Sequence, residues 1–202
     1  MLKLPDQVQP PTGQRLIHLT WPDRQLRFPA RTDGVLGVET GSGTARVEPL
    51  SHITQPLWDL LVATGRLDAL TTDESHELSY GKWEDPILGL ASAYALQDRH
   101  PDTLPTIIGN LRRLAVTHPD LVVLEASNGI GGLDDPQSRE AALHVLAAAS
   151  AVPVLRWGVP MARLLVARHR SPQLREWDRF LARVEAGLSP TSIWTAWSDQ
   201  DA

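Results

Sequence analysis

Short helical patterns recur at a nearly constant spacing between Asp85 and Leu188, and this repetition limits the possible folds more than any other feature. The predicted first residues of six helices are, in chain order, Pro86, Thr103, Pro119, Gln137, Pro153 and Pro172. In the fifth of these, Pro160 either kinks the helix or marks its true beginning. Equivalent helices are separated by roughly 33 to 35 residues, the period typical of stacked helix pairs. We therefore expect three antiparallel helix pairs that pack side by side as a solenoid.

Local signals mark where several of these helices begin and end. Asp85 and Asp135 each precede a proline, which combines a capping side chain with a proline at the first helical position. Ser171 precedes Pro172 and is expected to cap the last long helix in the same way. The glycine-rich run SNGIGG interrupts the second pair, so it predicts a long loop between the two helices of that pair.

The N-terminal quarter of the chain has a different pattern, which is typical of β-strands. Its short, partly alternating apolar runs are Leu16 to Thr20, Leu26 to Pro29, Gly34 to Thr40 and Ala45 to Leu50. A sheet of four short strands is marginal alone, so it should lean on the helices or join a larger sheet. We predict an α+β fold, mainly α, with a β-rich section at residues 1–52. A tetratricopeptide-like helical-repeat domain is expected at residues 53–202.

A short helix and an acidic stretch connect the strands to the repeats. Thr54 and Gly65 are placed to begin and end the helix. Residues 68–85 carry six acidic side chains against a single lysine, and they predict an exposed surface connection. The part from Thr71 to Lys82 would then be the natural place for a protease to cut.

Composition excludes several classes of protein. The 202 residues include no cysteine, so disulfides, thiolate nucleophiles and thiolate zinc sites are excluded. The formal net charge of -5 argues against nucleic acid as the main partner, because phosphate binding depends on clustered lysine and arginine. No segment approaches the ~20 apolar residues that span a bilayer. We expect a cytoplasmic protein that binds neither nucleic acid nor membrane.

No residue spacing is typical of a catalytic site. The loop that begins at Asn128 contains closely spaced glycines but lacks the lysine of a phosphate-binding P-loop. We therefore predict no catalytic, cofactor-binding or metal-binding residues. An alternative is a small metal-dependent enzyme built on His76, because Asp73, Glu74 and Glu77 lie close to it in the sequence and could supply oxygen ligands.

The remaining candidates are side chains that would contact another protein. Residues 156–183 are rich in arginine, and three arginines lie opposite the apolar stripe of the last long helix. Three tryptophans lie at the margins of the repeats, where an indole either seals an open repeat end or contacts a partner. The predicted partner-binding residues are Trp83, Arg175, Arg179, Arg183, Trp194 and Trp197.

A family resemblance rests on three helical segments, which read DPILGLASAYAL, PTIIGNLRRLAVTHPDLVVLEA and AALHVLAAASAVPVLRWGVPMARLLVAR. In this order they resemble the tetratricopeptide-like region that follows the catalytic domain in some bacterial caspase-like proteases and related defence or signalling proteins. The first-helix spacing of that repeat is matched by Ile87, Leu90, Ala91 and Tyr94. A caspase-like catalytic unit needs a cysteine, so the resemblance implies a scaffold or target that works beside such a protease.

These observations predict a non-enzymatic protein-interaction module, which acts as an adaptor, regulator or substrate in a bacterial protease-linked system such as antiviral defence. The expected partner is another protein, for example a caspase-like protease or its complex. A second hypothesis is an effector precursor that is activated by proteolysis. The metal-dependent enzyme built on His76 is the third.

Overall fold

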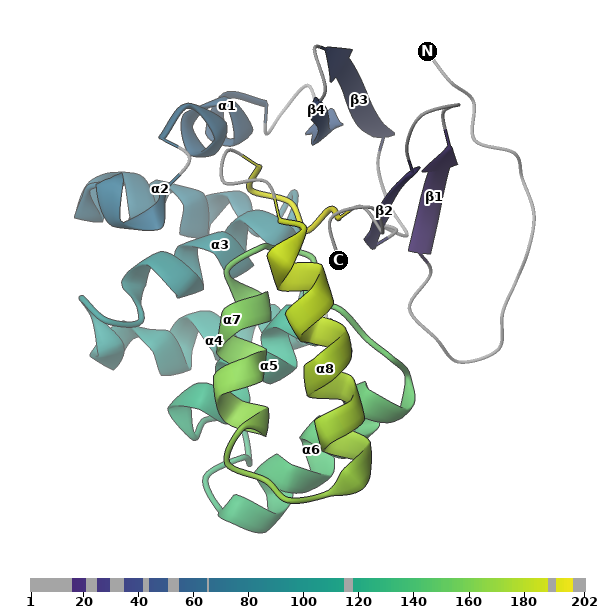
Figure 1. Ribbon diagram of the computed structural model, residues 1–202. Helices are drawn as coiled ribbons and strands as arrows, with labels where there is room; N and C mark the ends of the chain where they lie inside the picture. Colours follow the sequence, from purple (N-terminus) through teal and green to yellow (C-terminus); the bar gives the residue numbers. More distant parts are fainter. Residues whose placement is uncertain are drawn as a thin grey trace.

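The structure is a computed structural model, which Figure 1 shows as a ribbon. It describes residues 16–20, 25–29, 35–41, 44–50, 55–64, 66–114, 118–188 and 192–197. Thr54 and Gly65, which were predicted to begin and end the first helix, lie outside these ranges.

Helices dominate the described part of the chain, which confirms the prediction of a mainly helical protein. The α-helices are α1 (Gln55–Thr64), α2 (Thr72–Gly81), α3 (Pro86–Leu96), α4 (Leu104–Leu114), α5 (Pro119–Asn128), α6 (Pro136–Ala148), α7 (Gly158–Val166) and α8 (Pro172–Ala186). Two short 3-10 helices, η1 (Leu67–Ala69) and η2 (Pro101–Thr103), precede α2 and α4.

The strands near the N-terminus form two separate antiparallel ribbons. They are β1 (Leu16–Thr20), β2 (Gln25–Pro29), β3 (Val35–Gly41) and β4 (Thr44–Leu50). The first two strands pair with each other, and so do the last two. The prediction that residues 1–52 form a β-rich section of their own stays a prediction.

The capping signals place several helices where the sequence predicts them. Asp85 accepts a hydrogen bond from the backbone of Ile87 at 3.1 Å, with Pro86 at the first helical position. The other carboxylate oxygen of Asp85 accepts the indole N–H of Trp58 at 3.0 Å, which joins α1 to the start of α3. Asp135 caps α6 in the same manner. The side chain of Ser171 makes no capping bond, although α8 begins at the following proline.

The helices contact one another in the order expected of stacked pairs. Helix α3 contacts α4 and α5, α5 contacts α6 and α7, and α7 contacts α8. In Figure 1, α7 and α8 lie side by side, with α5 close to α7. The glycine run between α5 and α6 is a loop, and Gly129 adopts the left-handed conformation that ends α5.

The helix predicted to begin at Pro153 begins instead at Gly158. The backbone of the intervening residues is used for other contacts. Leu155 forms a β-bridge with Trp194, and the carbonyl of Val154 accepts the N–H of Thr195 at 2.8 Å. Because these backbone groups bind a distant segment of the chain, they are not available for a helical ladder.

The acidic connection predicted at residues 68–85 is also wrong, because most of it is helical. Helix α2 begins with a capping box between Thr71 and Glu74. It packs against α3 through the buried residues Ser75, Leu78, Ser79 and Gly81. The predicted cleavage segment is therefore a packed helix and not an exposed loop.

Two adjacent hydrophobic clusters fill the interior, and the C-terminal residues 192–197 contribute to both. Trp194 lies in the cluster built by α1 to α4, where its ring centroid is 6.3 Å from that of Trp58. Trp197 lies in the cluster of α6 to α8 and contacts Phe180 edge to face. Residues of α5 belong to both clusters. Residues 192–197 of the chain itself therefore cover apolar side chains of both clusters.

Within the described residues, none of the helices combines the length and the apolar character that crossing a bilayer requires.

We expect Trp194→Ala to destabilise the protein far more than Trp83→Ala. The side chain of Trp194 is fully buried and its loss leaves a cavity that costs about 3–5 kcal/mol, whereas Trp83 is 59% exposed and its loss changes stability by about 0.5 kcal/mol or less. Urea unfolding monitored by far-UV circular dichroism measures both values. Equal stability of the two variants would contradict this packing.

Candidate functional site

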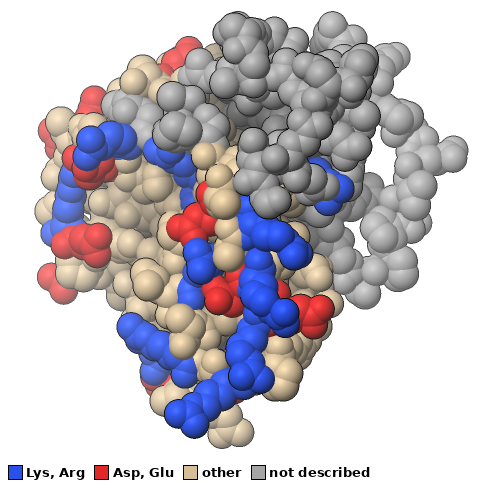
Figure 2. Space-filling model, in the orientation of Figure 1, with Lys and Arg blue, Asp and Glu red and all other residues tan. Residues whose placement is uncertain are grey.

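A row of three arginines runs along the exposed face of α8. Arg175, Arg179 and Arg183 are spaced four residues apart, and all three are exposed. At a rise of about 1.5 Å per residue, neighbouring members of this arginine row are about 6 Å apart along the helix axis. Figure 2 shows blue side chains along the front of the molecule, over the position of α8 in Figure 1.

Arg163 of α7 binds two of the acidic side chains of α8. Its Nε lies 3.1 Å from Oδ1 of Asp178, and its Nη1 pairs with the carboxylate of Glu185. Within the described residues, no carboxylate lies within 4 Å of any member of the arginine row. Asp178 and Glu185 therefore pair with the neighbouring helix, and the third acid of α8, the exposed Glu176, forms no ion pair with the arginine row.

A second exposed feature lies at the end of α2. Tyr80 is 76% exposed and Trp83 is 59% exposed, which is unusual for large aromatic side chains. The ammonium of Lys82 lies 5.8 Å and 5.1 Å from the centroids of these two rings and donates to the carbonyl of Ser79 at 2.7 Å. Burial lowers the pKa of Lys82 from its usual value. The predicted partner residue Trp83 thus belongs to an exposed aromatic pair.

The other two predicted tryptophans do not lie on this surface. Trp194 is 0% exposed and Trp197 is 3% exposed, so both indoles are covered by the chain's own helices. Of the two predicted alternatives for these tryptophans, this burial corresponds to sealing the interior. Neither side chain is exposed to a partner. The six predicted residues are therefore divided among the arginine row, the aromatic pair and the core.

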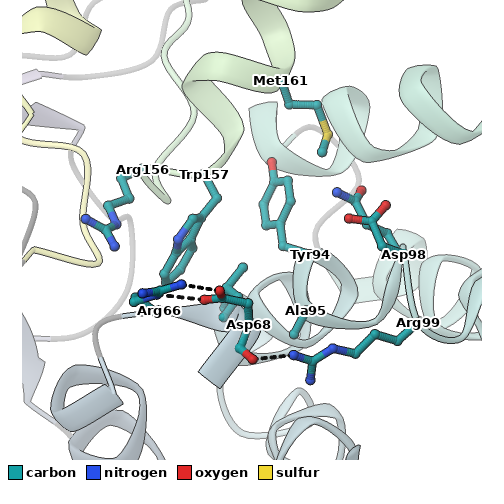
Figure 3. A pocket seen from close by; sticks show the side chains of 11 residues that line it. Arg66, Asp68, Tyr94, Ala95, Asp98, Arg99, Arg156, Trp157 and Met161 are labelled. Carbon is teal, nitrogen blue, oxygen red and sulfur yellow. Dashed lines mark hydrogen bonds and ion pairs between the residues drawn. The ribbon is translucent and has the colours of Figure 1, made fainter. Parts of the chain in front are cut away.

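A pocket of about 310 Å³ lies beside η1, the C-terminal end of α3 and the start of α7 (Figure 3). Among its lining residues are Arg66, Asp68, Tyr94, Arg99, Arg156 and Trp157. The lining includes no serine, threonine, cysteine, histidine or lysine, so these residues form no nucleophile and base pair of the usual kinds.

Three of the charged groups that line the pocket, Arg66, Asp68 and Arg99, bind one another or the backbone. Arg66 forms a two-bond ion pair with Asp68, with Nε to Oδ1 at 2.9 Å. Arg99 donates to the carbonyls of Asp68 and Leu70, as the view in Figure 3 illustrates for Asp68. These contacts hold η1 against the end of α3. They give Arg66, Asp68 and Arg99 a structural role in the lining of the pocket.

Behind the pocket lies a buried carboxylate that joins three segments. Asp120, in the first turn of α5, accepts the backbone N–H of Val154 at 2.6 Å and that of Leu155 at 3.2 Å. It also accepts the hydroxyl of Tyr94, from α3, at 3.1 Å. The nearest ring nitrogen of His118 is 3.4 Å from the carboxylate. Helix α3, helix α5 and the segment before α7 therefore meet at one side chain.

Burial controls the protonation of this group. Removal from water raises the pKa of Asp120 to about 7, although the hydrogen bonds from Val154, Tyr94 and Leu155 oppose the shift. Burial and the neighbouring carboxyl also raise the pKa of the Tyr94 hydroxyl, so this group remains a neutral donor. The carboxyl of Asp120 thus titrates near neutral pH, inside the helical core.

The sequence gives little indication of this network. An acidic residue in the first turn of a helix is common, because the helix dipole favours it there, and Tyr94 occupies a position of the apolar face. His118 lies at the N-terminal cap of α5. The partners on either side of Asp120 are more than 25 residues distant in sequence, so no local pattern connects them.

The residues around His76 are not arranged as a metal site. Glu74 binds Thr71 as part of the capping box, and the ring of His76 lies 6.0 Å from the ring of His100. Over the described ranges, no group of three histidine, aspartate or glutamate side chains is placed to hold a metal ion. The hypothesis of a metal-dependent enzyme gains no support from this geometry.

Comparisons with protein-family models, with curated proteins and with solved structures find no match to this chain.

We expect Asp120→Asn to change how stability depends on pH. Because the pKa of Asp120 is about 7 in the folded protein and ~3.9 in the unfolded chain, the folded state binds more protons between these values. The stabilisation is fully present below about pH 4 and is lost as the pH rises through about 7. The unfolding free energy of the wild type minus that of Asp120→Asn should therefore fall from acid to neutral pH.

Urea unfolding of both proteins across this pH range measures the difference. Asp120→Asn should also be less stable than the wild type at acid pH, by about 1–3 kcal/mol. The oxygens of Asp120 accept two backbone N–H groups, whereas the N–H₂ of asparagine would place a donor against one of them. Asp102→Asn, at an exposed position, is the matched control for the substitution itself. A difference that stays constant with pH would mean that Asp120 has the same charge in the folded and unfolded states.

Proposed function

We propose that this chain is a non-enzymatic protein-interaction module, in which tetratricopeptide-like helix pairs present the arginine row of α8 to an acidic segment of another protein. The observation that carries the proposal is the uncompensated charge of Arg175, Arg179 and Arg183. Two of the three acids of α8, Asp178 and Glu185, bind Arg163 instead, and the exposed Glu176 forms no ion pair with the row.

The arrangement costs stability, which favours a binding role. Arginines four residues apart on a helix repel one another by about 0.2–0.5 kcal/mol per pair. A guanidinium group binds a carboxylate through two parallel hydrogen bonds, so a partner with acidic side chains at the same spacing would remove this repulsion. A helical segment with acids every fourth residue has this spacing. An extended segment with acids at every second residue, about 6.6 Å apart, comes close to it.

The setting that the family resemblance suggests is part of the proposal. The module would act as an adaptor, regulator or substrate beside a bacterial caspase-like protease, with residues 1–52 as a separate β-rich section. Co-purification with proteins encoded next to it is the experiment that addresses this setting. The effector-precursor hypothesis is less well supported, because its cleavage segment lies in the packed helix α2.

Substitution of the whole arginine row with glutamine should abolish binding to an acidic peptide. The probe is a fluorescent 12-residue peptide with glutamate at alternate positions, measured by anisotropy at low salt. We expect at least about a tenfold loss of affinity for the triple variant, and a tenfold loss for the wild type when salt rises from about 50 mM to about 300 mM. The stability of the triple variant should equal or slightly exceed that of the wild type.

Arg113→Gln provides a matched control, because Arg113 is also exposed but lies on α4. Its affinity for the peptide should equal that of the wild type. Equal binding by the triple variant would remove the arginine row as the site. Tighter binding of duplex DNA than of the peptide would show that the row recognises phosphate and not protein carboxylates.

A further inference from the structure

Helix α2 carries an exposed stripe that is complementary to the arginine row. Asp73, Glu77 and Tyr80 are exposed and follow one another by four and three residues, so they lie on one face of the helix. We call these three residues the α2 stripe. Trp83 lies directly beyond its C-terminal end, as the second member of the exposed aromatic pair.

The opposite face of α2 fixes this stripe in place. Leu78 is fully buried, and Ser92 of α3 donates to the carbonyl of Ser75 at 2.7 Å. A side chain carbon added at Gly81 would lie 2.7 Å from Leu57 and 3.0 Å from Leu88, so the end of the helix is closely packed. The two faces of α2 are therefore distinct, and the stripe points to solvent on a rigid support.

The stripe and the arginine row lie on different helices of the stack. Contacts between helices run from α2 to α3, α5, α7 and α8, so three helices separate the two surfaces. Each copy of the chain thus has an acidic and aromatic surface on α2 and a basic surface on α8. Two different surfaces of opposite charge favour association between copies, head to tail.

We propose that the arginine row of one copy binds the α2 stripe of a second copy. This inference rests on the proposed function and names the partner of the same row. The carboxylates of Asp73 and Glu77 are about 6 Å apart along α2, which matches the spacing of two arginines on α8. The third arginine stacks on the ring of Tyr80, since guanidinium groups bind aromatic faces. Lys82 lies near the same rings but is buried, so it leaves their outer faces to the second copy.

The contact joins two different surfaces, so it repeats without closing into a symmetric dimer. Exposed ion pairs contribute little individually, which makes the association weak and strongly dependent on salt. Sedimentation velocity of the full chain, from about 10 µM to about 1 mM protein, is the appropriate measurement. At about 50 mM salt the average mass should rise with concentration above 22.2 kDa, and at about 300 mM salt it should remain at that value.

Two variants test the contribution of each surface separately. Arg175→Gln/Arg179→Gln/Arg183→Gln lacks the row and keeps the stripe, whereas Asp73→Asn/Glu77→Gln/Tyr80→Ala lacks the stripe and keeps the row. Each variant alone should remain at the monomer mass at low salt. Their equimolar mixture should form a complex of twice that mass and no larger species, because each copy then has only one competent surface.

Circular dichroism of each variant establishes that it is folded, and Arg113→Gln should associate as the wild type does. A wild type that stays monomeric at about 1 mM and low salt overturns the inference, as does a mixture that fails to associate. If the wild type stays monomeric but still binds the glutamate peptide, only the self-association is refuted. Loss of both activities would refute the proposed function as well.

Discussion

The buried carboxylate of Asp120 is the contact on which the arrangement of the helical stack most depends. Two backbone N–H groups of residues 154 and 155 donate to it, and without it both would be buried donors with no replacement in a helix or strand. The same carboxyl binds Tyr94 of α3. Space around it is tight, since a side chain carbon at Gly158 would lie 2.8 Å from Asp120 and 2.5 Å from the Tyr94 hydroxyl. Because this contact holds the segment before α7, it also determines where Trp194 can pair with that segment and seal the interior.

Local chemistry explains which helices could be predicted from the sequence. A proline at the first helical position is a local signal, so the starts of α3, α5, α6 and α8 were predictable, and in α3 and α6 a capping aspartate adds to it. The start of α7 was not, because Pro153 has the same local signal but its neighbours pair with a segment 40 residues away. Helix α2 was missed for another reason: of its four buried residues only Leu78 is apolar and large, and the small residues Ser75, Ser79 and Gly81 produce no hydrophobic period.

In the candidate site too, some residues follow from local spacing and others depend on contacts between distant helices. The arginine row could be found from spacing alone, since residues four apart on a helix share a face whatever the remainder of the chain does. The burial of Trp194 and Trp197 could not, because their neighbours Trp58 and Phe180 belong to distant helices. The sequence also could not show that no described carboxylate pairs with the arginine row. Only the position of Arg163 on the neighbouring helix shows that it, and not the arginine row, binds Asp178 and Glu185.

The distribution of charge in this molecule is a consequence of how the helices pack. Helix α8 carries both signs, but two of its three acids, Asp178 and Glu185, pair with α7, so three arginines and the single Glu176 remain exposed on it although the whole chain has a net charge of -5. Helix α2 retains Asp73 and Glu77 on the outside, because its buried face consists of the uncharged residues Ser75, Leu78, Ser79 and Gly81. Recognition by a charged helix face depends on spacing and charge and needs no cavity, whereas Arg66, Asp68 and Arg99 of the pocket already bind one another or the backbone.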